Sequence, residues 1–161
     1  MQKIRVLFVC LGNICRSPAA EGTFQQVVDD AGLTNRFEID SCGTGAYHIG
    51  EQPHPTTIQV ARQNGIKLDH LKARQFTQQD FRNFDYIFAM DASNLANIIR
   101  LAQSEEEKQK IYKFRKFDPD VQGEPDVPDP YFGGAEGFQN VQAIMLRTSQ
   151  GLLQWMQNKL T

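Results

Sequence analysis

A chain of 161 residues is long enough for one domain with a substantial core, and we expect residues 1–161 to form that single domain. The net charge of −2 gives no overall basic field, which argues against nucleic acid or an anionic membrane surface as a partner. No apolar run approaches the length of a membrane span, so we expect no membrane partner.

The cysteine content and the N-terminus both indicate a reducing compartment. The three cysteines are too few for a disulfide scaffold, and two of them, Cys10 and Cys15, lie close together in the sequence. Met1-Gln2-Lys3 leads directly into an apolar run, where no signal peptide fits. We therefore expect a cytoplasmic protein.

The first predicted strand, Ile4–Val9, leads into the most informative stretch of the chain, C-L-G-N-I-C-R-S-P. Cys10 stands at the end of the strand, and Arg16 stands where a helix predicted over Pro18–Ala31, and ended by Gly32, is about to begin. The dipole and free N–H groups of a helix N-terminus favour negative charge, so we expect Cys10 to be a thiolate near neutral pH. The planar guanidinium of Arg16 can then bind two oxygens of a tetrahedral anion.

The residues between this cysteine and this arginine are predicted to surround the bound anion. Gly12 and Asn13 tolerate the positive φ that a tight loop requires. Ser17 can cap the helix or donate to the thiolate, and Pro18 suits the first helical position. The loop lacks the Gly-Lys-Ser/Thr of a nucleotide-binding P-loop, and no G-x-G-x-x-G follows it. The predicted substrate-binding residues of the loop are Leu11, Gly12, Asn13, Ile14, Cys15 and Ser17.

Strands and helices alternate along the rest of the chain. Further strands are predicted over Phe37–Ser41, Tyr86–Met90 and Ile111–Phe117. Further helices are predicted over Pro55–Asn64, Gln78–Asn83 with Thr77 as its cap, Ala92–Leu101 with Asp91 as its cap, and Ala135–Leu160. This order predicts an α/β fold: a four-stranded, parallel, doubly wound sheet with helices on both faces and the ligand loop at the carboxyl end of a strand.

A thiolate that attacks a phosphate monoester needs an acid to protonate the leaving oxygen. The proline-rich segment 118–131 holds five candidates, and their spacing does not choose among them: Asp118, Asp120, Glu124, Asp126 and Asp129. Asp129 lies between two prolines and just before Tyr131-Phe132, an aromatic pair that could form the wall of a pocket for a flat substrate.

Two of these stretches resemble motifs of one known family. C-L-G-N-I-C-R-S-P resembles the signature loop of the low-molecular-weight protein tyrosine phosphatases, and Asp129-Pro130-Tyr131 resembles their general-acid loop. The resemblance spans nearly the whole chain and includes D-S-C-G-T at 40–44 and A-R-Q at 73–75. It implies a phosphoric monoester hydrolase, without metal or other cofactor, that hydrolyses phosphotyrosine in proteins or peptides through a phosphocysteine intermediate and releases inorganic phosphate.

The resemblance also implies roles for individual residues. Cys10 corresponds to the nucleophile, Arg16 to the residue that binds the phosphoryl oxygens, and Asp129 to the acid of the first step and the base of the second. Three residues are implied to support the loop and its thiolate: Asn13, Ser17 and Ser41, the last as a hydrogen-bond partner of the asparagine.

The rim of the pocket departs from the family pattern. Tyr47 stands where many relatives carry a larger aromatic residue, and Phe132 replaces a tyrosine beside Tyr131. Phe132 has no hydroxyl, so one phosphorylation site of some relatives is absent. His70 lies near a family histidine, but its spacing to the A-R-Q segment is longer by one residue, so no role is transferred to it.

Some readings of the sequence stay open. Cys15 is either a packed thiol or, as the resemblance suggests, a resolving thiol that forms a reversible disulfide with Cys10. The fold also suits an arsenate reductase, or a phosphate-binding module without catalysis. Arsenate reduction in thioredoxin-coupled relatives needs a later pair of redox cysteines, and none follows Cys42.

Overall fold

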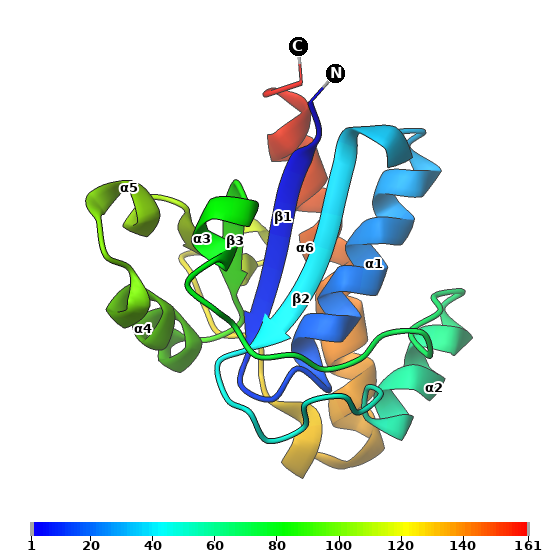
Figure 1. Cartoon of the computed structure of the whole chain (residues 1–161). Coiled ribbons are helices and arrows are strands. Elements are labelled where there is room, and N and C mark those ends of the chain that lie inside the picture. Colours follow the sequence, from blue (N-terminus) through cyan, green and yellow to red (C-terminus); the bar gives the residue numbers. More distant parts are fainter. Residues whose placement is uncertain (1, 161) are drawn as a thin grey trace.

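A parallel sheet forms the centre of the molecule (Figure 1). The computed structural model describes residues 2–160, apart from the side chain of Phe132. Within that range the sheet has four strands: β1 (Ile4–Cys10), β2 (Phe37–Gly43), β3 (Tyr86–Ala89) and β4 (Ile111–Lys113). Their order across the sheet is β2-β1-β3-β4, and every neighbouring pair is parallel. The predicted α/β fold with a four-stranded parallel sheet is confirmed.

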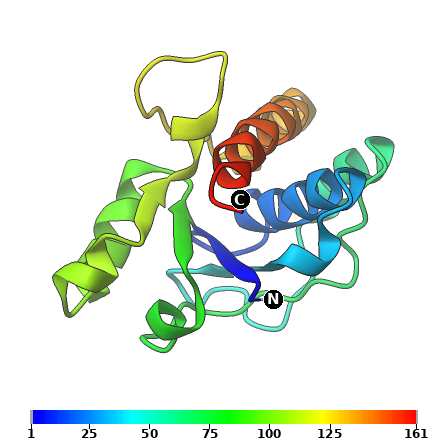
Figure 2. The same cartoon turned by 90° about the horizontal axis from the view of Figure 1, so that it is seen from above.

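Helices cover both faces of this sheet. Their bounds are α1 (Arg16–Asp30), α2 (Pro55–Gln63), α3 (Asp80–Asn83), α4 (Ala92–Leu101), α5 (Glu105–Lys108) and α6 (Gly134–Gln157). Short 3-10 turns cover Thr34–Arg36, Phe114–Phe117 and Pro130–Phe132. Viewed from above, α1 and α6 lie side by side on one face, and α4 lies toward the other (Figure 2).

The residues of β1 show why helices are needed on both faces. Val6 and Phe8 are fully buried in a cluster with side chains of α1 and α6. Leu7 and Val9 point to the opposite face and are fully buried with side chains of α3 and α4. A strand that is apolar at consecutive positions is typical of a parallel sheet covered on both faces, because each face loses water on folding.

The topology places the loop after β1 where a ligand is expected. β1 pairs with β2 on one side and with β3 on the other, so the chain changes direction across the sheet at the carboxyl end of β1. Doubly wound sheets bind ligands at this switch point, because the connections on either side lead away from it. Cys10 is the last residue of β1, and the loop that follows lies at the lower edge of the sheet in Figure 1.

The structure corrects two predicted helix starts. α1 begins at Arg16, so Pro18 is its third residue and not its first. This position suits proline as well, because none of the first N–H groups of a helix has a partner within it. Thr77 does not cap α3, which begins at Asp80; instead the Asp80 carboxylate accepts a hydrogen bond from the Thr77 backbone. The predicted cap of α4 is confirmed, since the Asp91 carboxylate accepts from the backbone N–H of Asn94.

The last predicted strand is too long. β4 ends at Lys113, and residues 114–117 form a 3-10 turn. Phe114 is fully buried in the cluster with α1 and α6, so the chain turns away from the sheet to bring its ring into that core. The apolar run 111–117 is therefore partly strand and partly core turn, a difference that apolar periodicity alone does not reveal.

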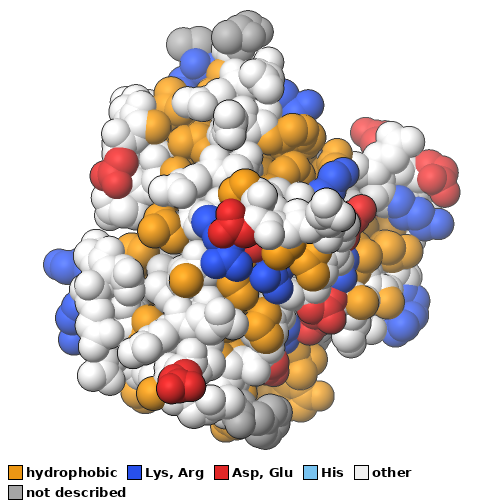
Figure 3. Space-filling view, turned by 180° about the vertical axis from the view of Figure 1, so that it is seen from behind, with side chains coloured by type: hydrophobic (Ala, Val, Ile, Leu, Met, Phe, Trp, Pro, Cys, Tyr) orange, Lys and Arg blue, Asp and Glu red, His pale blue; other side chains and the backbone are white. Residues whose placement is uncertain are grey.

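Charges of both signs are mixed on the surface seen in Figure 3, in agreement with the low net charge. On the face drawn in Figure 3, Lys and Arg side chains lie next to Asp and Glu side chains. None of the helices in residues 2–160 combines the length and the apolar character that crossing a membrane would require.

Candidate active site

The sulfur of Cys10 lies beneath the loop that leads from β1 into α1. The backbone N–H of Asn13 donates to Sγ over 3.3 Å, and the hydroxyl oxygen of Ser17 lies 3.0 Å from Sγ. Only 3% of Cys10 is exposed, so these groups rather than bulk water surround its sulfur. Both groups can stabilise negative charge on the sulfur by hydrogen bonding.

Asn13 braces this loop from inside. Its φ of 58° is left-handed, whereas Gly12, the other residue expected to use positive φ, does not adopt it. The amide nitrogen of Asn13 donates to the hydroxyls of Ser17 and Ser41 over 2.8 and 3.0 Å. Its amide oxygen accepts from the backbone N–H of Arg74 over 3.0 Å. One side chain therefore ties the loop to β2 and to the segment before α3.

The chain after β2 supports the outside of the loop. The N–H groups of Thr44 and Gly45 donate to the carbonyls of Cys10 and Leu11, each over 2.9 Å. The approach requires glycine at Gly43, because a Cβ there would lie 2.6 Å from the Leu11 carbonyl oxygen. Any larger residue at this position would push the loop away from β2.

Arg16 is held at the first turn of α1 by partners from distant parts of the chain. Its Nη1 donates to Oδ2 of Asp91 over 2.7 Å and to the Val127 carbonyl over 3.0 Å. Burial alone would lower the pKa of Arg16, but the hydrogen bond to Asp91 and nearby negative groups outweigh burial and raise that pKa. The guanidinium therefore stays charged. The sequence identified Asp91 only as a helix cap and missed this second contact, since nothing in the spacing links the two residues.

A pocket of about 380 Å³ opens above this sulfur and guanidinium. Its lining is Cys10, Leu11, Gly12, Ile14, Cys15, Arg16, Tyr47, His48, Asp129 and Tyr131. Most of the predicted site residues are thus brought together, and His48 is an addition that sequence reasoning missed. Asn13 and Ser17 lie behind the sulfur, not on the pocket wall. The side chain of Phe132, predicted on the rim, lies outside the described part of the chain.

Asp129 is the acid that reaches this pocket. Its Oδ2 lies 3.8 Å from Nη2 of Arg16, and its Oδ1 accepts from the backbone N–H of Tyr131 over 3.0 Å. The side chain is 43% exposed, so it can exchange protons with solvent. Asp118, by contrast, is buried and paired with two arginines, and Asp126 is paired with a lysine. Tertiary structure thus separates candidates that their spacing left equivalent.

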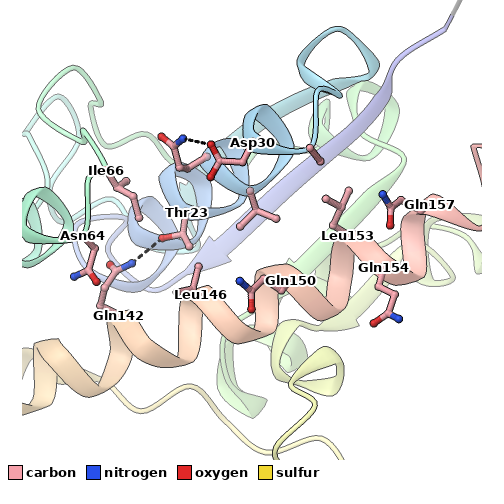
Figure 4. A pocket seen from close by; sticks show the side chains of 13 residues that line it. Thr23, Asp30, Asn64, Ile66, Gln142, Leu146, Gln150, Leu153, Gln154 and Gln157 are labelled. Atoms are coloured by element: carbon pink, nitrogen blue, oxygen red, sulfur yellow. Dashed lines mark hydrogen bonds between the residues drawn. The ribbon is translucent and has the colours of Figure 1, made fainter.

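A larger hollow, of about 600 Å³, lies between α1 and α6 (Figure 4). Gln142 donates to the Thr23 hydroxyl across it, and the ionisable side chain in its lining is Asp30. It brings no nucleophile together with an acid and a cation, so the smaller pocket is the candidate active site. Among residues 2–160, no three His, Cys, Asp or Glu side chains are grouped so that they could hold a metal ion.

Cys15 is packed under the loop. It lies in a small cluster with Val60 and Phe138, and burial raises the pKa of its thiol to about 12. Burial likewise raises the pKa of Cys42 well above its usual range. All three cysteines are free thiols in this structure. This environment suits the packed-thiol reading of Cys15, and the Cys10–Cys15 disulfide stays a prediction that mass spectrometry of peroxide-treated protein can test.

Glu21 adds a titratable group beneath the loop. The Ser41 hydroxyl, which accepts from Asn13, donates to Oε1 of Glu21 over 2.6 Å. Burial raises the pKa of Glu21 from 4.5 to about 7. His70, whose role stayed open, is exposed and lines a hollow next to Glu21.

Replacing Glu21 by Gln is expected to reduce the pH dependence of stability. The folded protein retains a proton that the unfolded chain releases above pH 4.5, so the contribution of Glu21 is complete below that pH and is lost as the pH rises through about 7. The loss is on the order of 3 kcal/mol. Urea unfolding at about pH 5 and about pH 7.5 should show a smaller change in the free energy of unfolding for Glu21→Gln than for the parent. An equal change in both proteins would rule out this carboxyl as the source.

Comparisons with known proteins agree with this geometry. The family model described as low molecular weight phosphotyrosine protein phosphatase matches residues 5–161. A low molecular weight phosphotyrosine protein phosphatase of Schizosaccharomyces pombe is 49% identical over 154 residues, which cover 94% of this chain and 96% of that protein. A low molecular weight protein-tyrosine-phosphatase of Streptomyces coelicolor is 47% identical over 150 residues, which cover 92% and 91%.

Solved structures give the same result. The crystal structure of a protein tyrosine phosphatase from Entamoeba histolytica, with Hepes in its active site, matches with a TM-score of 0.92 and 38% identity, covering 99% of this chain and 100% of that one. The crystal structure of YfkJ from Bacillus subtilis matches with a TM-score of 0.91 and 39% identity, covering 99% and 98%. By its fold, its loop and its relatives, the chain belongs to the low molecular weight phosphotyrosine protein phosphatase family.

Proposed function

We propose that this chain hydrolyses phosphotyrosine in proteins or peptides by two phosphoryl transfers, with a phosphocysteine on Cys10 between them. The reaction class follows from family membership: the chain is a protein-tyrosine phosphatase, a phosphoric monoester hydrolase. The observation that carries the mechanism is the meeting of Cys10, Arg16 and Asp129 in one pocket.

In the first transfer, Sγ of Cys10 attacks phosphorus and the bond from phosphorus to the tyrosine oxygen breaks. The charge lies on the equatorial phosphoryl oxygens, and the transition state is loose, so positioning and charge stabilisation supply most of the catalysis. Arg16 is fixed by Asp91 and by the Val127 carbonyl, so its guanidinium needs little reorganisation as charge shifts during the phosphoryl transfer. Arg16 and the N–H groups of the loop can therefore bind the phosphoryl group.

Asp129 gives its proton to the leaving tyrosine oxygen in this first step. In the second step a water oxygen attacks phosphorus, the S–P bond breaks, and Asp129 takes a proton from that water. The products are inorganic phosphate and the regenerated thiolate. Because Asp129 must be protonated while Cys10 is ionised, we expect a bell-shaped pH dependence with an acidic to near-neutral optimum.

Exposed apolar side chains stand around the mouth of the pocket. Leu11, Tyr47 and Tyr131 all line it and are all more than one third exposed. Flat and apolar walls suit the ring of a phosphotyrosine whose phosphoryl group reaches the sulfur below. We therefore assign the aromatic ring of the substrate to this rim and the phosphoryl group to the loop.

Alcohol trapping tests the covalent intermediate. Turnover in the presence of methanol should give methyl phosphate and inorganic phosphate in a ratio that is the same for p-nitrophenyl phosphate and for phosphotyrosine. Both substrates would form the same phosphocysteine, which no longer contains the leaving group. A ratio that changes with the leaving group would mean that water attacks the substrate directly.

Two other functions that this fold could serve, arsenate reduction and phosphate binding without catalysis, receive less support. The curated relatives described above are named as phosphatases, and no cysteine follows Cys42 to serve as a later redox pair. A phosphate-binding module would need neither the acid nor the nucleophile, yet both line the pocket. We also propose that residues 1–161 form one domain and that the protein works in the cytoplasm, where free thiols persist.

A further inference from the structure

The loop that carries Asp129 is anchored at the residue pair Asp126–Val127. Oδ1 of Asp126 accepts from the backbone N–H of Ala92, the first residue of α4, over 2.9 Å. The same oxygen accepts from Nζ of Lys113, on β4, over 2.6 Å. One carboxylate thus joins the loop to the start of a helix and to the edge of the sheet.

Val127 continues this anchor toward the active site. Its side chain is fully buried in the main core cluster. Its N–H donates to the carbonyl of Met90, the residue directly after β3, over 2.7 Å, and its own carbonyl accepts from Arg16 over 3.0 Å. Residues 126–127 therefore form hydrogen bonds with Met90, with β4, with α4 and with the phosphate-binding arginine.

The position of Asp129 depends on this anchor, because the contacts of its own carboxylate are weak. It is two residues beyond Val127, and it accepts a hydrogen bond from its near neighbour Tyr131, while Arg16 is 3.8 Å away. Pro128 and Pro130 flank it, and each proline restricts the residue before it as well as itself. A displacement at residues 126–127 would pass along this stiff segment to the carboxyl of Asp129.

The ion pair that secures the anchor is well formed. The side chain of Lys113 is only 11% exposed, so its ammonium has little access to water and needs a negative partner. The hydrogen bond from Lys113 lowers the pKa of Asp126, so the carboxylate is charged at neutral pH. The two members differ in exposure: the side chain of Asp126 is 53% exposed, so it is the loss of Asp126 that leaves a poorly solvated charge, on Lys113.

We propose that Asp126, paired with Lys113 and with the first amide of α4, is a positioning residue that holds Asp129 over the pocket for proton transfer. It touches neither the substrate nor the reacting atoms. The proposal rests on the proposed role of Asp129 as the acid.

Leaving-group dependence tests this role. For Asp126→Asn and for Lys113→Met, kcat/KM for phenyl phosphate, whose leaving group needs a proton, should fall roughly tenfold, a fraction of what a general acid contributes. With 2,4-dinitrophenyl phosphate, whose leaving group needs no proton, kcat/KM should change less than about twofold. Retained activity on the second substrate also shows that the variants fold.

A matched control removes a similar charge pair elsewhere. Asp69 pairs with Arg62 over 2.8 Å, and both side chains are at least half exposed. Asp69→Asn should leave both substrates unaffected. If Asp126→Asn or Lys113→Met instead slows both phenyl substrates equally, the anchor acts on the phosphate-binding loop through the Val127 carbonyl, and the proposal is overturned.

A double variant separates this proposal from the one on which it rests. In the Asp129→Asn background, Asp126→Asn should cause no further loss, because the group that it positions is absent. An additional tenfold loss there would overturn the positioning role. If Asp129→Asn shows no leaving-group dependence by itself, the acid assignment fails and this inference fails with it. If Asp129→Asn shows that dependence and Asp126→Asn does not, only the positioning role fails.

Discussion

Replacing Cys10 by Ser is expected to abolish turnover while binding of inorganic phosphate survives. A serine hydroxyl stays protonated at neutral pH, and it cannot replace a thiolate as nucleophile without a strong base beside it. The groups that contact Sγ in this protein are a backbone N–H and the Ser17 hydroxyl, neither of which is such a base. We expect kcat for p-nitrophenyl phosphate to fall by about four orders of magnitude or more.

Phosphate affinity distinguishes lost chemistry from a lost site. Arg16 keeps its contacts to Asp91 and Val127 in Cys10→Ser, so calorimetric titration with inorganic phosphate should give an affinity close to that of the parent. Cys42→Ser is the matched control, since it makes the same change at a buried cysteine outside the pocket lining and should retain turnover. Substantial turnover by Cys10→Ser would contradict the covalent route.

Replacing Asp129 by Asn is expected to slow substrates with poor leaving groups most. Asn has nearly the same shape but no proton to give, and general acid catalysis is typically worth about 10² to 10⁴ in rate. kcat/KM for a phosphotyrosine peptide should fall within that range, while 2,4-dinitrophenyl phosphate should be nearly unaffected.

The control for this variant lies in the same loop. The side chain of Asp120 is 69% exposed and lies 3.6 Å from Arg147. Asp120 does not line the pocket. Asp120→Asn should leave the leaving-group dependence and the pH profile unchanged. An Asp129→Asn variant that hydrolyses the phosphotyrosine peptide at the parent rate would remove Asp129 from the acid role.

Local sequence patterns predicted the fold well where neighbouring residues alone specify a helix or a strand. Apolar runs identified the sheet strands, and Asp91 was recognised as the cap of α4, since caps and periodicity are properties of neighbouring residues. The prediction was wrong at residues 114–117, where the burial of Phe114 against α6 decides the backbone. Competition between sheet pairing and core packing depends on a partner more than 20 residues away, which a short window does not contain.

The candidate site divides in the same way. The sequence by itself determined the loop from Cys10 to Arg16, because a strand, a short turn and a helix N-terminus keep a nucleophile and a cation together whatever the rest of the chain does. The family resemblance pointed to Asp129 where spacing did not, but only the tertiary structure decided that Asp129 approaches Arg16 and that Asp91 holds Arg16, because these contacts close chain loops of 75 residues and more. Their geometry depends on the packing of α4 and the acid loop against the sheet, and no local spacing encodes that packing.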